Sequence, residues 1–171
     1  ASYGDPGNLR TVNYYSTLDG KLLRSVQPDG RITIYGHVPG FYTTNTIPGE
    51  FHSNTSNQWE LVSTITGTDT EGVRIAKHTT MDVQIINPAG RTVATKQYVF
   101  TGDSEEWSPI GWTENELDDS GRIVTTLRSD GTVSESTWGC CGKDSDKDSS
   151  GIVTLNTYDD LKRLTLIEKE E

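Results

Sequence analysis

The sequence lacks long apolar runs. Hydrophobic residues make up 32% of the 171 residues, whereas about 45–50% of a globular domain is usually apolar when glycine is counted as well. A stretch of about 18 apolar residues, which a membrane-spanning helix needs, is absent. We therefore expect no membrane span and a thin core. A thin core suits an extended sheet better than a thick globule.

Positive charge is also scarce. The chain has 15 Lys and Arg against 25 Asp and Glu, which gives a net charge of −10. Binding to nucleic acid requires a surface rich in Lys and Arg, so this class of function is excluded. An acidic surface stays soluble and attracts divalent cations.

Cysteine occurs only as the adjacent pair Cys140 and Cys141. A disulfide-stapled small domain needs cysteines spaced along the chain, so this class is excluded too. Residues 1–5 lack the basic start and apolar middle of a signal peptide. Because the sequence begins and ends within repeat-like sequence, we expect it to be a segment of a larger repeat protein.

Turn glycines are present at regular intervals. Gly20, Gly30 and Gly40 are ten residues apart, and the same spacing returns near the C-terminus. There the rungs fall at Gly121, Gly131 and Gly151, with Gly142 close to the missing position and residues 158–163 continuing the pattern. A fixed interval of this kind is the signature of a repeat architecture.

Most of these glycines follow an acidic or amide residue. Such pairs favour hairpin turns, because glycine adopts positive φ and Asp or Asn bonds to nearby backbone. The segments between the turns alternate apolar and polar residues and are rich in β-branched side chains, which is typical of strands. The predicted fold is all-β, an antiparallel hairpin ladder in a twisted sheet that spirals or partly closes. Its turn residues include Asp19, Gly20, Asp29, Gly30, Gly90, Gly121, Asp130, Gly131 and Gly151.

We expect one structural unit with three sections, residues 1–50, 51–112 and 113–171. The middle section predicts longer strands in the same sheet, and its connection at residues 67–72 is expected to lead into a strand over residues 73–78. Residues 159–171 carry helix formers without a cap pattern, and we favour a strand there.

The chain resembles the YD-repeat family, also called Rhs repeats, whose unit is Tyr-Asp, two residues, Gly-Arg and a strand. Tyr158 and Asp159 match the start of this unit, with Leu161 in place of the usual glycine and an inserted Lys162. The Gly-Arg core is matched at Gly30-Arg31, Gly90-Arg91 and Gly121-Arg122.

The resemblance covers about half of the chain, mainly its two ends. It implies a secreted or cell-surface protein in which such hairpins coil into the wall of a hollow shell. The family's autoproteolytic segment has no counterpart here, so release of cargo is not implied.

The basic residues after the turn are expected to pair across strands with acidic turn residues, which stabilises by only about 0–1 kcal/mol for each exposed pair. These basic residues are Lys21, Arg31, Arg91, Arg122 and Lys162.

Cys140 and Cys141 lie between two glycines. Outside the cell, adjacent thiols can close a strained disulfide ring that fixes a tight turn, and we favour this interpretation. The alternative places the two on opposite faces of a strand, with one of them joined to another chain. A zinc site would need two further ligands.

Asp144, Asp146 and Asp148 alternate along the chain as the first ligands of a calcium loop do. Ser149 and Leu155 stand where such a loop needs glycine and a bidentate glutamate. Calcium is thus one hypothesis for this segment, and a solvated acidic turn is the favoured one.

The chain has four tryptophans. Residues 105–112 read as a loop, because Pro109 and Gly111 break regular structure. This loop would expose Trp107 and Trp112 to stack on sugar rings, although tryptophans also serve as packing anchors in a chain with few large apolar residues.

Catalytic motifs are sparse. His37, His52 and His78 stand in unrelated contexts, without a nucleophile elbow, phosphate loop or zinc-protease motif. We therefore expect no enzyme and no cofactor other than calcium. The first hypothesis is a structural segment that joins neighbouring repeats, or other copies of itself, through its sheet edges. A carbohydrate-binding module that contacts glycans is the second hypothesis, and a glycoside hydrolase is the third.

Overall fold

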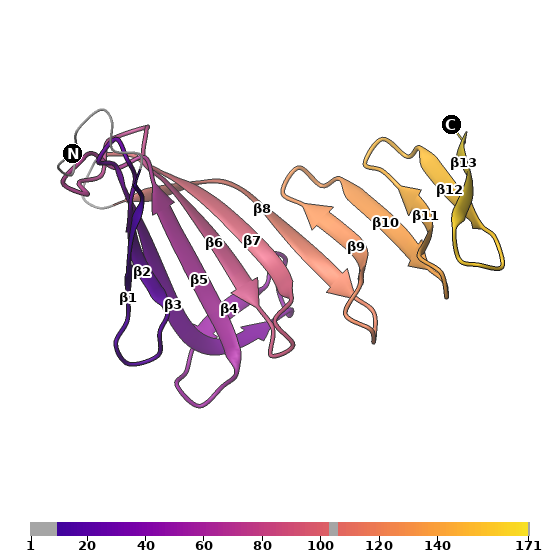
Figure 1. Cartoon of the computed structure of the whole chain (residues 1–171), viewed down its shortest axis with the longest axis horizontal. Coiled ribbons are helices and arrows are strands. Elements are labelled where there is room, and N and C mark those ends of the chain that lie inside the picture. Colours follow the sequence, from indigo (N-terminus) through magenta and orange to yellow (C-terminus); the bar gives the residue numbers. More distant parts are fainter. Residues whose placement is uncertain (1–9, 103–105, 171) are drawn as a thin grey trace. The chain divides into compact units, whose positions relative to one another are not determined.

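The structure, a computed structural model, describes residues 10–102 and 106–170. Within these ranges it consists of thirteen β-strands with no helix, which confirms the predicted all-β class (Figure 1). Accordingly, the described ranges hold no helix that could cross a membrane. The strands are β1 (Val12–Tyr15), β2 (Leu22–Val26), β3 (Ile32–Thr43), β4 (Glu50–Ser53), β5 (Trp59–Thr66), β6 (Thr80–Ile86), β7 (Thr92–Phe100), β8 (Trp107–Leu117), β9 (Ile123–Arg128), β10 (Val133–Trp138), β11 (Lys143–Lys147), β12 (Val153–Tyr158) and β13 (Leu164–Glu170).

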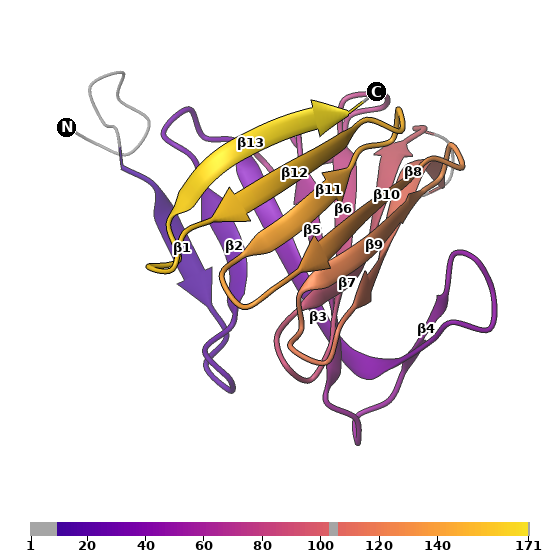
Figure 2. The same cartoon turned by 90° about the vertical axis from the view of Figure 1, so that its right-hand side faces the viewer.

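The strands follow one another in the sheet almost in chain order. Their order is β1-β2-β3-β5-β6-β7-β8-β9-β10-β11-β12-β13, with β4 paired to β3 off this path. Successive strands are antiparallel, for example β11 with β12 and β12 with β13 (Figure 2). β1 and β13 end the order, so the sheet is not closed. The predicted antiparallel ladder is confirmed, and the predicted strand at residues 159–171 is β13.

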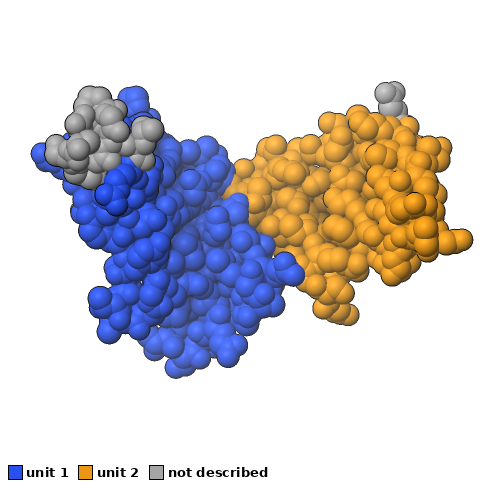
Figure 3. Space-filling model, viewed as in Figure 1, with its two compact units in different colours: residues 1–111 blue, residues 112–171 orange. Residues whose placement is uncertain are grey.

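The chain divides into two compact units, residues 1–111 and residues 112–171 (Figure 3). Among the described residues, unit 1 contains the buried side chains, which lie on β2, β3, β6, β7 and the loop at residues 67–79. The buried apolar side chains are Val26, Ile32, Val83, Ile85, Val93 and Ala94, and the buried polar ones are Ser25, Thr68 and Thr79.

The prediction of a strand over residues 73–78 was wrong, because these residues belong to the loop at 67–79. Two buried threonines anchor this loop. The Thr68 hydroxyl donates to the carbonyl of Ile32 at 2.6 Å. The Thr79 hydroxyl donates to the carbonyl of Gly67 at 2.9 Å and accepts from the N–H of Ile75 at 2.7 Å. The threonine hydroxyls thus make hydrogen bonds to backbone groups that a neighbouring strand would otherwise bond. The alternation of apolar and polar residues in the sequence alone could not show this.

The prediction of a loop over residues 105–112 was also wrong for the described residues, since β8 begins at Trp107. Residue 105 lies outside the described ranges. β8 pairs with β9 only from Thr113 onward. Pro109 precedes that stretch, so its missing N–H removes no bond from the β8–β9 ladder, and the proline is tolerated in the strand.

Unit 2 consists of the end of β8 and the strands β9 to β13. None of its residues from 112 to 170 is buried. Its strands therefore form a single layer, in which each strand is stabilised by the strands that it pairs with and by the turns between them. The expectation of a thin core therefore applies most strongly to unit 2.

Candidate functional site

Seven turns in the described residues share one hydrogen-bonding frame of five residues, and six of them connect paired strands. The N–H of the first residue donates to the carbonyl of the fifth, and the N–H of the fourth donates to the carbonyl of the first. The fourth residue has a left-handed backbone, with φ between 62° and 91°. The seven frames are residues 27–31, 69–73, 87–91, 118–122, 128–132, 148–152 and 159–163.

An acidic or amide side chain fixes each frame. In five frames the first residue is Asp or Asn, and its Oδ1 accepts the N–H groups of the third and fifth residues. Asp118 is typical, with both distances at 2.9 Å. In the other two frames the carboxylate belongs to the third residue, Asp29 or Asp130, and it accepts the backbone N–H of the fifth residue. The Asp-Gly motifs at residues 29–30 and 130–131 and the Asp-x-x-Gly motifs are therefore two ways of closing the same frame, whereas Asp19-Gly20 lies in a longer turn, in which the N–H of Ser16 donates to the carbonyl of Lys21.

An arginine in the fifth position strengthens three of the frames. The Nε of Arg122 donates to Oδ2 of Asp118 at 2.7 Å, and Arg163 and Asp159 make the same bond. Arg31 reaches back to Asp29 at 2.6 Å. The expectation of pairing across strands was wrong for Arg31 and Arg122. The backbone N–H groups already hold the carboxylate beside the turn, so the nearest guanidinium is the one in the same turn.

These hydrogen bonds favour the charged form of the turn carboxylates. Backbone and side-chain bonds from Arg122 lower the pKa of Asp118. Side-chain and backbone bonds from Arg163 lower the pKa of Asp159 in the same way. The groups are solvent-exposed, so the effect on stability is small and screened by salt.

The last frame corrects the sequence alignment. We assigned the glycine position to Leu161 and treated Lys162 as inserted, but Lys162 is the residue with positive φ, at 62°. The fifth position is Arg163, which bonds to Asp159. Lys162 therefore replaces the glycine, and no residue is inserted.

We expect Lys162→Gly to stabilise the chain by about 0.5–1 kcal/mol, because a left-handed backbone is costly for a residue with a Cβ. Leu161→Gly is the matched control. Leu161 is 70% exposed, so little packing is lost, and glycine at a position without positive φ should destabilise by about 0.5–1 kcal/mol. Urea unfolding of both variants measures the difference. A stabilising Leu161→Gly with a neutral Lys162→Gly would contradict the assigned frame.

The turn between β10 and β11 is of another kind. Cys140 and Cys141 form its tip, and the N–H of Gly139 donates to the carbonyl of Gly142 at 2.9 Å. Both cysteines are free thiols, with Cys140 exposed and Cys141 half-buried. Their Sγ atoms are 2.8 Å apart. The pair therefore lies at a turn, as predicted, but the disulfide is not formed in this structure.

The two glycines of this turn are in close contact with neighbouring strands. A Cβ on Gly139 would lie 2.5 Å from Oδ2 of Asp144, and one on Gly142 would lie 2.5 Å from the Tyr158 hydroxyl. That hydroxyl donates to the carbonyl of Lys143 at 3.1 Å. Tyr158, the tyrosine of the repeat motif, thus holds the start of β11.

The three aspartates of the acidic segment lie on a strand and in a turn, and calcium binding there stays a prediction. Asp144 and Asp146 lie on β11, and Asp148 is the first residue of a turn frame. The Asp146 carboxylate already accepts bonds from Lys143 at 2.6 Å and Ser136 at 2.7 Å, and these bonds lower its pKa. Among the described residues there is no group of three or more His, Cys, Asp or Glu that could hold a metal ion.

The two tryptophans proposed for glycan contact belong to different units, Trp107 to unit 1 and Trp112 to unit 2. Trp107 is half-buried, with its ring 5.7 Å from that of Phe100 and the Arg74 guanidinium 5.4 Å above it. Trp112 is half-buried too. Glycan binding stays a prediction, and Trp107 has the packing role that the sequence offered as its alternative.

A charged cluster in unit 1 was missed by the sequence analysis. One carboxylate oxygen of Glu60 accepts bonds from the Lys21 ammonium at 2.5 Å and from Nδ1 of His37 at 2.9 Å. The other ring nitrogen of His37 lies 3.0 Å from the carbonyl of Leu22. Burial acts to raise the pKa of Glu60, but the bonds from Lys21 and His37 outweigh it, and the pKa lies below its ordinary value.

No local pattern could have indicated this cluster, since its members come from the residue before β2, from β3 and from β5. In the pairing of β3 with β5, Pro39 lies opposite Glu60. His37 is two residues before Pro39, so its side chain is on the same face of β3 and only this pairing places it near Glu60.

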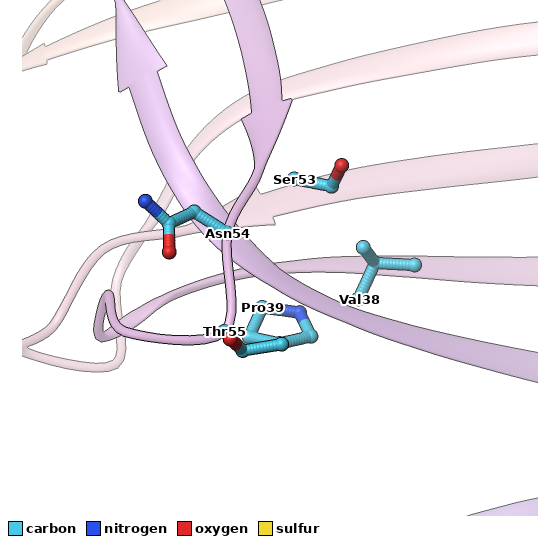
Figure 4. Close-up of a pocket in the computed structure, with 5 residues that line it drawn as sticks. All are labelled: Val38, Pro39, Ser53, Asn54 and Thr55. Atoms are coloured by element: carbon cyan, nitrogen blue, oxygen red, sulfur yellow. The ribbon is translucent and has the colours of Figure 1, made fainter.

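A small open pocket of about 380 Å³ lies between β3 and the end of β4 (Figure 4). It is lined by Val38, Pro39, Ser53, Asn54 and Thr55. This lining carries no titratable side chain, and we assign the pocket no role.

The C-terminal strand β13 forms an open edge of unit 2. Every residue from Leu164 to Glu170 is exposed, and among the described strands β13 pairs with β12 only. The exposed fractions are 49% for Leu164, 48% for Leu166 and 56% for Ile167. An exposed edge strand with apolar side chains is a template for a further strand.

No protein-family model matches the sequence, and the search of curated proteins found no similar protein. Solved structures similar to the chain include those titled TcdB2-TccC3-Cdc42, TcdB2-TccC3 and TcdB2-TccC3-TEV. The sequence identities are 11%, 13% and 14%, and the TM-scores are 0.35, 0.31 and 0.30. The matches cover 93%, 94% and 93% of this chain and 10% of each of the others, so the chain spans about a tenth of their length.

Proposed function

We propose that the chain is a structural segment of the YD-repeat type from a secreted or cell-surface protein, and that it acts without catalysis. The observation that carries this proposal is the shared turn frame. The same five-residue arrangement closes four of the hairpins of unit 2, at residues 118–122, 128–132, 148–152 and 159–163. A sheet built from one repeated turn grows by the addition of hairpins.

The packing of unit 2 supports a role as part of a longer sheet. Folding usually depends on apolar burial, yet none of the residues 112–170 is buried. Strand pairing and the turn carboxylates therefore stabilise this unit. Such a layer gains stability from each added neighbour, as in other repeat proteins.

The occupant we assign to the free edge of β13 is a strand of a further repeat of the same kind. β12 already pairs with β13 through six residue pairs, from Val153 with Glu170 to Tyr158 with Leu164. A next strand would continue this ladder on the other side of β13 and cover the exposed Leu166 and Ile167.

The test is to extend the chain by one designed repeat, a frame of Asp-Glu-Ser-Gly-Arg followed by a strand of alternating Thr and Val. We expect amide hydrogen exchange in β13 to slow by about tenfold, which corresponds to about 1.4 kcal/mol. The melting temperature should rise by about 2–4 °C for each kcal/mol gained.

The control extension carries the same strand with Ala and Val in place of the frame's Asp and Gly, so that the hairpin cannot close. It should leave exchange in β13 as in the parent chain. Equal protection by both extensions, or none by either, would contradict growth through the turn frame. Light scattering of the parent chain checks the same edge: a concentration-dependent dimer that the designed repeat abolishes supports the proposal.

A further inference from the structure

We propose that Cys140 and Cys141 form a thiol–disulfide exchange site that low-molecular-weight disulfides oxidise to an intramolecular disulfide. This inference is independent of the proposed structural function. It rests on how the turn at residues 139–142 is held and on the different surroundings of the two thiols.

The turn brings the two sulfurs together before any reaction. The Sγ atoms are 2.8 Å apart, and Gly139 and Gly142 are linked by a backbone hydrogen bond of 2.9 Å. The carboxylate of Asp144 and the hydroxyl of Tyr158 lie so close to these glycines that a Cβ at either position would collide with them. Groups held in reacting geometry react far faster than free ones.

The residues beside the turn add to its support. The Trp138 indole N–H donates to the carbonyl of Ile123 at 2.8 Å. The Arg122 guanidinium and the Lys143 ammonium lie 5.5 Å and 5.4 Å from the centre of the Trp138 ring. The residue next to the dithiol turn is thus held by a hydrogen bond and by contacts with two cations.

The two thiols have different roles. Cys140 is exposed, whereas Cys141 is half-buried. The hydrogen bond with Cys140, burial and the charges of Cys140 and Asp144 raise the pKa of Cys141, and the nearby Lys162 only partly offsets this. Because the thiolate is the attacking species, Cys140 attacks first and Cys141 acts second.

The reaction proceeds in two exchange steps. The Cys140 thiolate attacks one sulfur of the small disulfide, whose S–S bond breaks, and the first small thiolate leaves and takes up a proton. Cys141 then loses its proton and attacks Sγ of Cys140, which releases the second small thiolate. Two protein thiols are oxidised, and one disulfide is reduced to two thiols.

The experiment treats the folded chain with oxidised glutathione and follows intact mass and tryptophan fluorescence. We expect the wild type to lose two hydrogens without retaining glutathione, and its emission to fall as the disulfide forms beside Trp138. Dithiothreitol should restore both signals. Cys141→Ser should accumulate a glutathione adduct on Cys140, and Cys140→Ser should react more slowly, because its remaining thiol, Cys141, is half-buried.

Two further variants isolate the role of the turn. Gly142→Ala would force a Cβ against Tyr158, so ring closure should slow and the glutathione adduct should become detectable. The double variant Cys140→Ser/Cys141→Ser should show no change in mass or emission, which assigns both signals to this pair.

Three results would overturn the proposal. The first is a stable glutathione adduct on the wild type, and the second is a disulfide-linked dimer on non-reducing electrophoresis. The third is ring closure no faster in the folded chain than in a Gly-Cys-Cys-Gly peptide, since the turn would then contribute nothing.

Discussion

Replacing Ile85 by alanine is expected to lower the free energy of unfolding by about 2–5 kcal/mol, the range for large-to-small changes in a core. Ile85 lies on β6 with 1% of its surface exposed, opposite Leu61 of β5 and Ala94 of β7. The buried apolar set of the described residues is small, so little neighbouring mass is available to fill the cavity. Urea unfolding followed by circular dichroism measures the loss.

Ile167→Ala is the matched control, with the same change in a strand position that is 56% exposed. It should cost less than about 1 kcal/mol, because only strand propensity and partial contacts are lost. Equal losses for the two variants would show that unit 1 has no dominant core. They would place the stability of both units in strand pairing.

The second large effect is expected at Glu60, whose carboxylate joins the Lys21 ammonium and the His37 ring. Glu60→Gln keeps the size of the side chain and removes the charge, so we expect a loss of about 1.5–3 kcal/mol at neutral pH, the range for hydrogen bonds to charged groups. Because the pKa of Glu60 is lowered in the folded chain, its contribution is present above the ordinary pKa of about 4.3. It is lost as the pH falls through the lower folded value.

Unfolding of wild type and Glu60→Gln between about pH 7 and pH 3 tests this, since that window brackets the ordinary glutamate pKa. The two curves should converge at the acid end. The control is Glu50→Gln, because Glu50 is more exposed and lies 3.9 Å from its partner His52. This control should change stability by less than about 0.5 kcal/mol. Parallel loss in wild type and Glu60→Gln as the pH falls would contradict the role of the cluster.

The hairpin ladder could be predicted because the residues that determine each turn lie close together in the sequence. At Asp118 the carboxylate, the two N–H groups that it accepts and the left-handed Gly121 all lie within five residues. This turn can therefore be recognised in the sequence without knowledge of any contact with a distant residue. The frame at residues 69–73 has the same chemistry, with Asp69 first and Gly72 fourth, and its position inside a long loop concealed it.

The remaining features depend on partners far away in the chain. Thr68 bonds to Ile32, 36 positions earlier, and this contact makes a loop of a segment that alternates like a strand. Glu60 meets Lys21 across 39 positions. The alignment at Lys162 was wrong for another reason. Lys162 adopts a left-handed backbone conformation, which usually indicates glycine. Local motifs therefore give the turns, and long-range pairing decides loops and charged sites.

The single layer of unit 2 also has an evolutionary consequence. In a domain with a shared core, an inserted segment must fit every element around it. In unit 2 each strand meets only the strands before and after it, as the pairing of β11 with β10 and β12 shows. Because successive strands are antiparallel, duplication or deletion of a whole hairpin would add or remove two rungs and leave the direction of the following strands unchanged. The gene could therefore change the length of its product by whole hairpins without redesign of a shared core.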